Sequence, residues 1–219
     1  MWSEDVILMI LNGVKETLYM TLASTILGYV FGLPMGICLA VSDKDGLKPN
    51  AVLYKILDLI SNIVRSIPFL ILLILVIPLT RLLVGQSYGS SATIVHWWWQ
   101  QCRLLQEWWN LRLKKWMREL IEAAKAMGAG NFTIITRVLL VEARTSLITG
   151  ATIAIGTILG YSAMAGTVGG GGLGDIAIRY GYYRYQSEIM IVTVVLLVIL
   201  VQIFQSAGMK AASVLDKRK

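Results

Sequence analysis

The chain has 219 residues, of which 56% are hydrophobic and 15% charged, with a mean hydropathy of +0.67 and a net charge of +7. This composition excludes an ordinary soluble domain and fits one polytopic membrane domain. The basic residues stand between and after the apolar runs, as on the cytoplasmic side of membrane proteins, so the positive charge does not indicate nucleic acid. We therefore predict a single transmembrane domain over residues 1–219, with membrane lipid and no nucleic acid among its partners.

Two apolar stretches open the chain. Residues 1–16 are mixed in character and predict a short interfacial helix, whereas residues 17–42 carry no charge and exceed the ~20 residues that cross a bilayer. The second stretch, residues 51–80, contains a few charges and two prolines. It predicts a long helix that Pro68 and Pro78 break.

A tryptophan-rich stretch follows between residues 96 and 120, and it reads HWWWQQCRLLQEWWNLRLKKWMREL. Its tryptophans and basic residues alternate at helical spacing. By itself the stretch predicts a basic amphipathic helix at the membrane interface, because tryptophan prefers the headgroup layer. The residues that fall near one side of this helix are Trp97, Trp98, Leu105, Trp108, Trp109, Trp116 and Leu120.

The charge pattern requires one more crossing before the small-residue stretch that comes next, because the early lysine-containing loop and the basic C-terminus both belong in the cytoplasm. Either residues 82–102 cross, or the helix over residues 97–109 crosses with Arg103 and Glu107 turned inward. Each unpaired charge in such a helix costs at least ~2.5 kcal/mol. We expect residues 108–120 to lie along the cytoplasmic interface.

The stretch from residue 122 to residue 141, EAAKAMGAGNFTIITRVLLV, is rich in small residues and lies between apolar runs. Good helix formers from Glu122 to Met127 predict a helix, and Gly128 is placed to end it in a left-handed turn. Asn131 is placed to cap a second helix. The local prediction is a helix, a glycine turn and a helix at a membrane surface.

This stretch is similar to the EAA loop of ABC importer permeases. The positions that carry the resemblance are Glu122, Ala123, Ala124, Gly128, Val138 and Leu140. The family usually has a proline next, where this chain has Val141, so the second helix is expected to run on where the family bends. Residues 65–81 and 160–186 resemble the methionine-uptake subgroup.

The resemblance covers most of residues 5–95 and 121–215, and it fails between them. At these positions the resemblance implies a span of small residues that includes glycine and proline. Residues 96–120 keep the expected length but not those residue types.

The resemblance implies an all-α polytopic membrane helical bundle of about five transmembrane helices, like a type I ABC importer permease, in a bacterial inner membrane. It implies the permease subunit of an ATP-driven importer of methionine, with a second copy of itself, ABC ATPase subunits and an external substrate-binding lipoprotein as partners. A coupling loop of about residues 121–141 would then dock in a groove of the ATPase. The coupling residues expected from this resemblance are Glu122, Ala123, Ala124, Lys125, Ala126, Met127 and Gly128.

Residues 145–166 and 189–209 predict two further spans. The first of them carries Gly160 close to Ser162 and Met164. Mild polarity and small side chains fit a helix that lines a path between subunits, with Ser162 and Met164 as the path residues. Simple helix packing explains the same residues equally well.

The segment between these spans is rich in glycine and then in tyrosine. Residues 169–174 are not a phosphate-binding loop, because no Lys-Ser or Lys-Thr follows and Asp175 would repel phosphate. Residues 175–188 predict an external loop with Arg179, Arg184 and several tyrosines. This loop could meet a binding protein or form an interfacial aromatic belt.

Nothing in the chain predicts an enzyme. His96 is the only histidine, no cysteine or carboxylate cluster has metal-ligand spacing, and no serine stands in a nucleophile motif. We therefore expect no metal and no cofactor, and the energy for transport must come from a partner ATPase. Two alternatives stay open: a permease for another small amino acid or peptide, and a membrane-anchored scaffold that uses the tryptophan-rich helix.

Overall fold

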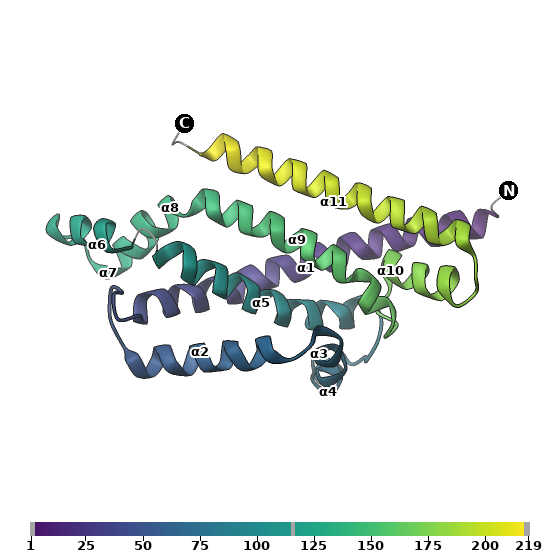
Figure 1. Cartoon of the computed structure of the whole chain (residues 1–219), viewed down its shortest axis with the longest axis horizontal. Helices are drawn as coiled ribbons and strands as arrows, with labels where there is room; N and C mark the ends of the chain where they lie inside the picture. Colours follow the sequence, from purple (N-terminus) through teal and green to yellow (C-terminus); the bar gives the residue numbers. More distant parts are fainter. Residues whose placement is uncertain (1–2, 115–116, 217–219) are drawn as a thin grey trace.

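A computed structural model of the chain describes residues 3–114 and 117–216, without the side chains of residue 65, residues 103–105 and residues 107–118. Every regular element in this part of the chain is helical, which confirms the predicted all-α class. The elements (Figure 1) are α1 (Glu4–Ser42), α2 (Ala51–Ser66), α3 (Phe69–Leu75), α4 (Ile77–Val84), α5 (Ser90–Lys114), α6 (Met117–Ala126), α7 (Asn131–Thr133), the π-helix η1 (Ile134–Leu139), α8 (Leu140–Glu142), α9 (Arg144–Gly166), α10 (Gly172–Ile176), the π-helix η2 (Ala177–Tyr182) and α11 (Ser187–Leu215).

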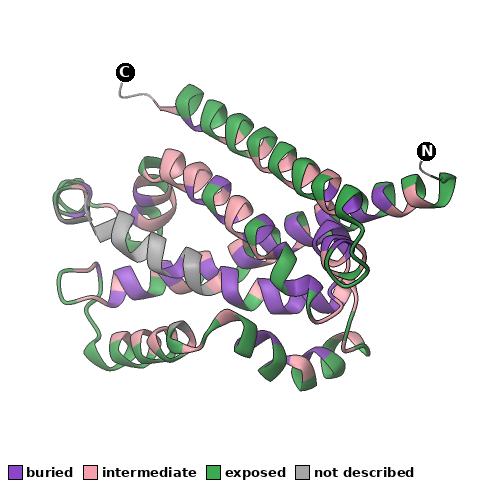
Figure 2. Cartoon of the chain, turned by 45° about the vertical axis from the view of Figure 1, so that its right-hand side comes forward, coloured by how far each residue is buried: buried purple, intermediate pink, exposed green. Residues whose placement is uncertain are grey.

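The bundle is organised around α1. This helix packs most extensively against α5 and also contacts α2, α9 and α10. Helix α11 lies on α9 along one edge of the molecule, and α2 lies along the opposite edge (Figure 1). Both edge helices are largely exposed, whereas the buried residues gather where α1, α5 and α9 meet (Figure 2).

Helix α1 is one element from Glu4 to Ser42, so the prediction of a separate interfacial helix over residues 1–16 is wrong. Two of its buried hydroxyls bond to their own helix: Thr17 Oγ1 donates to the Gly13 carbonyl at 2.8 Å, and Ser24 Oγ donates to the Met20 carbonyl at 2.6 Å. The helix therefore stays continuous through its polar positions. Small residues on the buried face let neighbouring helices approach closely, and they include Gly28, Gly32 and Gly36.

The two prolines of the second apolar stretch break it, as predicted. Helix α2 ends at Ser66, α3 begins at Phe69 after Pro68, and the bend between α2 and α3 is 101°. Pro78 lies in the first turn of α4, where a missing backbone N–H leaves no hydrogen bond broken.

Among the described residues, α1, α9 and α11 are long and apolar enough to cross a membrane, and the bent pair of α2 and α3 raises the number of candidate spans from three to four. The composition of α5 is too polar for this helix to be counted as a candidate span. It nevertheless begins beside the glycine-rich loop, where the Gly89 N–H donates to the Gly169 carbonyl at 2.9 Å, and it ends next to α6. At 1.5 Å per residue its 25 residues extend about 37 Å.

Helix α5 thus occupies the place of a fifth span. Of the two alternatives for the crossing before residue 122, this placement favours the helix over residues 97–109 rather than residues 82–102. The side chains of Arg103 and Glu107 lie outside the described residues.

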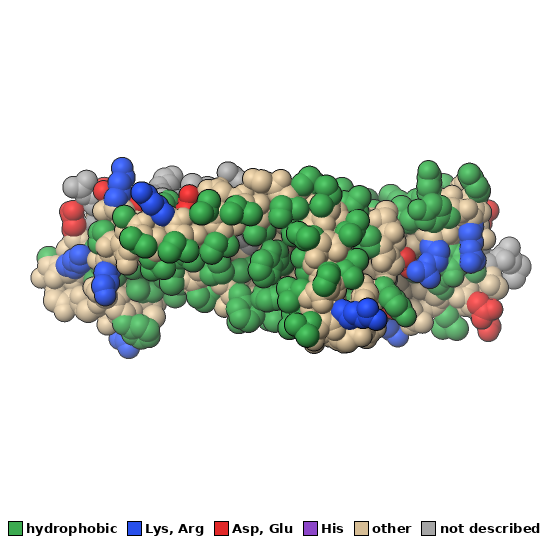
Figure 3. Space-filling model, turned by 90° about the horizontal axis from the view of Figure 1, so that it is seen from below, with side chains coloured by type: hydrophobic (Ala, Val, Ile, Leu, Met, Phe, Trp, Pro, Cys, Tyr) green, Lys and Arg blue, Asp and Glu red, His purple; other side chains and the backbone are tan. Residues whose placement is uncertain are grey.

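The surface of the bundle matches a lipid environment. Viewed from below, its middle is mostly hydrophobic, and most of its charged side chains lie toward the two ends (Figure 3). Val195, Val198 and Ile203 on α11 are 50%, 54% and 57% exposed. An apolar belt of this extent is a surface that lipid or another subunit covers.

The two ends of the bundle differ in charge. The loop between α1 and α2, helices α6 to α8 and the C-terminal end of α11 lie at one end (Figure 1). That end carries Lys44, Lys48, Lys125, Arg137 and Lys210. The positive-inside rule therefore assigns it to the cytoplasm, and it assigns the N-terminal end of α1 and α10 to the outside.

Candidate functional site

The predicted coupling segment is a helix, a tight turn and a second helix, as the sequence indicated. Gly128 has φ +78°, which is the left-handed conformation expected of a residue that ends α6. The Gly128 N–H donates to the Lys125 carbonyl at 2.9 Å, and the Ala129 N–H donates to the Ala124 carbonyl at 3.0 Å. These two bonds form a Schellman motif, so the turn between the helices is defined by its own backbone.

The start of the second helix differs from the prediction. Helix α7 begins at Asn131 itself, its N-cap is Gly130, and no side-chain cap bond forms, so the assignment of Asn131 as the N-cap is wrong. Beyond η1, the Ala143 N–H donates to the Leu139 carbonyl at 2.9 Å and leads the chain into α9. The helix therefore runs on past Val141, as expected from the absence of proline there.

The inner face of the coupling segment packs on the cytoplasmic end of α1. Ala124 is only 2% exposed and Ile134 is fully buried. They belong to a hydrophobic group that we call the seat cluster, made of Ala40, Leu47, Ile121, Ala124, Ile134 and Leu139. The small side chain of Ala124 is therefore used by the chain's own packing, and it faces away from any partner.

The outer face carries the other predicted coupling residues. The exposed residues on this face are Glu122, Ala123, Lys125, Ala126, Met127 and Gly128. Two large apolar side chains flank the glycine turn, and Met127 is 80% exposed and Phe132 79% exposed. Exposed apolar side chains of this size, outside the candidate spans, indicate a surface that another protein covers.

A polar cavity of about 250 Å³ opens beside this surface, where the loop between α1 and α2 meets α6. Its lining carries both signs of charge and consists of Lys44, Asp45, Gly46, Ile121, Glu122 and Lys125. The loop and α6 thus form one continuous polar surface at the cytoplasmic end.

The two predicted path residues lie on different faces of α9. Ser162 is 1% exposed, and its hydroxyl accepts a hydrogen bond from the Gly174 N–H at 3.2 Å. Met164 is 45% exposed, and a Cβ added at Gly160 on the same helix would meet open space. The face at Met164 is therefore the open one, whereas Ser162 holds α10 against α9 from behind.

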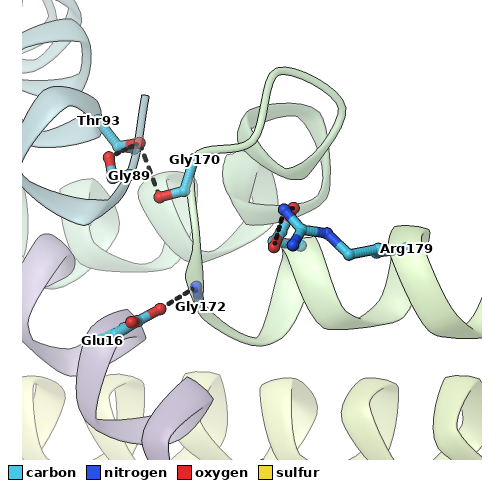
Figure 4. A network of polar contacts seen from close by, with 7 residues as sticks. Glu16, Gly89, Thr93, Gly170, Gly172 and Arg179 are labelled. Carbon is cyan, nitrogen blue, oxygen red and sulfur yellow. Dashed lines mark hydrogen bonds and ion pairs between the residues drawn. The ribbon is translucent and has the colours of Figure 1, made fainter. Parts of the chain in front are cut away.

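At the outer end, hydrogen bonds tie the glycine-rich loop to α1 and α5 (Figure 4). The Gly172 N–H donates to Glu16 Oε2 at 2.7 Å, and Thr93 Oγ1 donates to the Gly170 carbonyl at 2.9 Å. Beside them, the Leu173 N–H donates to Thr17 Oγ1 at 2.9 Å. We call this set the glycine clasp, and its members are Glu16, Thr17, Thr93, Gly170, Gly172 and Leu173.

No motif in the sequence predicts the glycine clasp. Its only local signal is a run of glycines, three of which, at residues 169, 171 and 172, have positive φ. Such a backbone leaves its N–H groups outside any helix ladder, so side chains of other elements must accept from them. Glu16 was the visible candidate, because it follows the polar start of α1 directly before a charge-free run.

The tyrosine-rich segment is helical as far as Tyr182, so the prediction of a loop over residues 175–188 is wrong for its first half. Tyr182, Tyr183 and Tyr185 are 63%, 65% and 89% exposed. The Arg184 guanidinium carbon lies 4.6 Å from the centre of the Tyr180 ring. This segment therefore presents an aromatic and cationic surface at the outer end.

An ion pair anchors the start of this segment. Arg179 Nη2 lies 3.0 Å from Asp175 Oδ2 (Figure 4), and the Asp175 side chain is 13% exposed. Burial raises the pKa of Asp175 above its ordinary value, and the charge of Glu16 adds to the rise while Arg179 opposes it. The carboxylate is thus held in a site that penalises its charge.

The tryptophan-rich helix is not an interfacial element over its first turns. Trp97 is fully buried in a hydrophobic cluster with Met20, Ile94 and Ile158, so the interfacial assignment is wrong for this residue. The structure does not describe the side chains of residue 105 or of residues 108–118. Most of the helix side predicted from the sequence, and most of the segment assigned to the interface, therefore lie outside the described residues. Within the described part of the chain, no three His, Cys, Asp or Glu side chains gather as a metal site.

Comparisons with known proteins agree on one family. Residues 113–214 match the family described as binding-protein-dependent transport system inner membrane component. The "Probable D-methionine transport system permease protein MetI" of Vibrio cholerae is 44% identical over 200 residues, which cover 91% of this chain and 89% of that protein. The D-methionine transport system permease protein MetI of Escherichia coli K12 is 43% identical over 164 residues, which cover 75% of this chain and 76% of that protein.

A solved structure has the same fold. The chain superposes with a TM-score of 0.95 on a chain of the MetNI methionine ABC transporter in an inward-facing conformation. The two chains are 42% identical, and the match covers 99% of this chain and 100% of the other.

Proposed function

The chain belongs to the family of binding-protein-dependent transport system inner membrane components, and we propose that it is the permease subunit of an ATP-driven methionine importer. Its relatives are named for D-methionine transport, and the superposed chain comes from a methionine ABC transporter. The observation in this chain that carries the proposal is the coupling surface, by which we mean the exposed face of residues 122–132. It has the exposed apolar side chains and the stiff turn that a docking element needs.

The partner at the coupling surface is an ABC ATPase subunit. The chain carries no phosphate-binding motif of its own, so ATP is bound and hydrolysed on the partner. Met127 and Phe132 would enter an apolar groove, while Glu122 and Lys125 form a polar rim around them. Ala123 is an exposed alanine of this surface, and a bulky side chain there would block the contact.

Motion of the ATPase reaches the spans through two routes. The seat cluster connects Ala124 and Ile134 to the end of α1, which is the axis of the bundle. The near-continuous helix through η1 and α8 connects the same surface to α9. Because both routes start at a turn with a defined backbone, ATP-driven closure would switch the spans between two states rather than bend them gradually.

The substrate path lies between two copies of the chain. One bundle of this size encloses little, and no described residue of the single chain covers the face of α9 at Met164 and Gly160. In this arrangement Met164 contacts the path, and Ser162 supports it by fixing α10. The outer aromatic surface at Tyr182, Tyr183 and Tyr185 is where an external substrate-binding protein would dock.

The experiment is co-purification with the ATPase subunit, followed by an ATPase assay in lipid with and without the binding protein. We expect methionine-loaded binding protein to stimulate hydrolysis and leucine to leave it unchanged. Stimulation by another small amino acid or peptide would replace methionine as the substrate. Failure of an intact, membrane-inserted chain to bind any ATPase subunit would overturn the permease assignment.

A further inference from the structure

Among the described residues, nearly all of the buried polar atoms without a hydrogen-bond partner lie on α5. Six buried side-chain nitrogen or oxygen atoms lack a hydrogen-bond partner among the described residues. Five of the six belong to Trp97, Trp98, Gln101 and Gln106, and the sixth is Thr21 Oγ1. Buried polar groups in native proteins are nearly always paired, so a concentration of unpaired ones on one helix requires an explanation.

The surroundings of these side chains are built for apolar neighbours. Gln101 is 1% exposed and Gln106 is 2% exposed. An apolar cavity of about 150 Å³ remains open beside this part of α5, although large side chains line it, among them Phe31, Trp98 and Trp99. Unpaired amides next to an unfilled cavity indicate a helix whose side chains do not match the place it occupies.

The genetic code relates this segment to an apolar one. Tryptophan has the single codon TGG, so two successive tryptophans read TGGTGG, and a frame displaced by one nucleotide reads GTG, which is valine. We number each displaced codon by the residue that supplies its last two nucleotides. Position 97 is then leucine, positions 98 and 99 are valine and position 100 is alanine, whichever synonymous codons the gene uses.

The same displacement removes the five unpaired atoms found in the described part of α5. Position 101 becomes alanine or threonine, position 102 methionine or valine, and position 106 serine, proline, threonine or alanine. No choice of synonymous codons puts a charged residue at positions 96–106, although the chain itself has Arg103 there. At positions 96–106 the displaced frame thus encodes an uncharged and largely apolar helix, which can pack against the small-residue face of α1.

The opposite displacement does not give a span. When each of its codons is numbered by the residue that supplies the last nucleotide, it encodes isoleucine or threonine at position 97, glycine at positions 98 to 100, and asparagine or serine at positions 101 and 102. Three successive glycines followed by two such polar residues are a poor helix. The apolar result therefore depends on one direction of displacement.

We propose that residues 96–119 are the product of a reading frame displaced by one nucleotide, in a bundle built for the helix that the displaced frame encodes. The EAA motif from Glu122 onward is in the ordinary frame, and so is the apolar stretch that ends at Val95. One inserted and one deleted nucleotide would produce this segment, one of them before codon 96 and the other at the end of the segment near codon 119. Because the two changes compensate, the length of the segment is preserved. The tryptophan-rich surface then has no scaffold function of its own.

The first test is the nucleotide sequence of the gene. The displaced frame must stay open from codon 96 to codon 119, and a stop codon within it would overturn the proposal. One position at which the code permits a stop is codon 103, if a cysteine codon TGT precedes an arginine codon AGA or AGG.

The second test uses the full chain with matched variants of five residues. One variant carries the displaced-frame residues, Trp97→Leu, Trp98→Val, Trp99→Val, Gln100→Ala and Gln101→Ala. The control carries the opposite-frame residues, Trp97→Thr, Trp98→Gly, Trp99→Gly, Gln100→Gly and Gln101→Asn. Both are purified in detergent, and the monodisperse yield and the melting temperature are measured.

We expect the displaced-frame variant to melt about 5 °C or more above the parent chain and the control to melt below it. A displaced-frame variant that is no more stable than the parent, or a control that gains as much, would overturn the proposal.

Discussion

The carboxylate of Glu16 on α1 accepts a 2.7 Å hydrogen bond from the backbone N–H of Gly172, which lies 156 residues later in the chain. This bond joins the axial helix of the bundle to the loop that leads from α9 into α10. Thr93 on α5 holds the same loop through the Gly170 carbonyl. The outer parts of α1 and α5 are therefore linked by polar contacts to the loop that leads into α10.

Removing the clasp hydroxyl of Thr17 should destabilise the bundle. Thr17→Val keeps the shape of the side chain but leaves the Leu173 N–H buried without an acceptor, which costs about 1–3 kcal/mol. Thermal unfolding in detergent measures the loss as a lower melting temperature. The matched control is Thr157→Val, because the Thr157 hydroxyl donates to the Ile153 carbonyl of its own exposed helix face. Equal effects of the two substitutions would contradict the clasp.

The glycine turn of the coupling segment should tolerate a side chain at one glycine and not at the other. Neither Gly128 nor Gly130 has an atom within 4 Å of an added Cβ, but only Gly128 has positive φ, at +78°. Gly128→Ala should therefore cost about 1–2 kcal/mol through its left-handed backbone. Gly130→Ala should be close to neutral. Melting temperatures of the two variants check this, and a neutral Gly128→Ala would show that the turn is not constrained.

The exposed apolar pair of the coupling surface should control ATPase binding without controlling stability. Met127→Ser and Phe132→Ser change side chains that are 80% and 79% exposed, so the melting temperature should hardly move. Binding of the ATPase subunit should weaken about tenfold or more, as for buried apolar contacts at an interface. Val214→Ser, at a residue that is 85% exposed on α11, is the control. Unchanged affinity in both coupling variants would remove this face as the docking site.

The partly buried carboxyl of Asp175 should make one contribution to stability that grows as the pH falls. Its folded-state pKa is raised above the ordinary 3.8, so the folded chain binds this proton more tightly than the unfolded chain does. Between the ordinary and the raised value, lowering the pH therefore stabilises the folded state. The melting temperature of the parent chain should rise relative to that of Asp175→Asn as the pH falls from about 7 to about 4. A difference that shrinks on acidification would show that the ion pair with Arg179 dominates instead.

Local patterns in the sequence were enough to predict the elements that depend on local chemistry. The helix over residues 122–127 and its glycine turn follow from helix propensity and the left-handed preference of glycine, and the structure has both. The spans at residues 145–166 and 189–209 follow from hydropathy and correspond to α9 and α11.

Tertiary contacts decided the rest. Ala123 and Ala124 are adjacent alanines, and the sequence cannot say that Ala124 faces inward, because its neighbours Leu47 and Ile134 come from other elements. The roles of Glu16 and Ser162 likewise depend on backbone N–H groups at Gly172 and Gly174. Sequence patterns identify side chains, whereas the partners of Glu16 and Ser162 are backbone N–H groups. The sequence alone therefore does not predict these contacts.

Uptake into proteoliposomes is a direct measure of ATP-driven methionine transport through this chain. The vesicles contain the chain, its ATPase subunit and ATP on the cytoplasmic side, with labelled methionine and the binding protein on the other. We predict accumulation that requires ATP, that excess unlabelled methionine suppresses, and that Ala123→Trp abolishes while the chain stays inserted. ATP-independent accumulation, or full uptake by Ala123→Trp, would contradict the account.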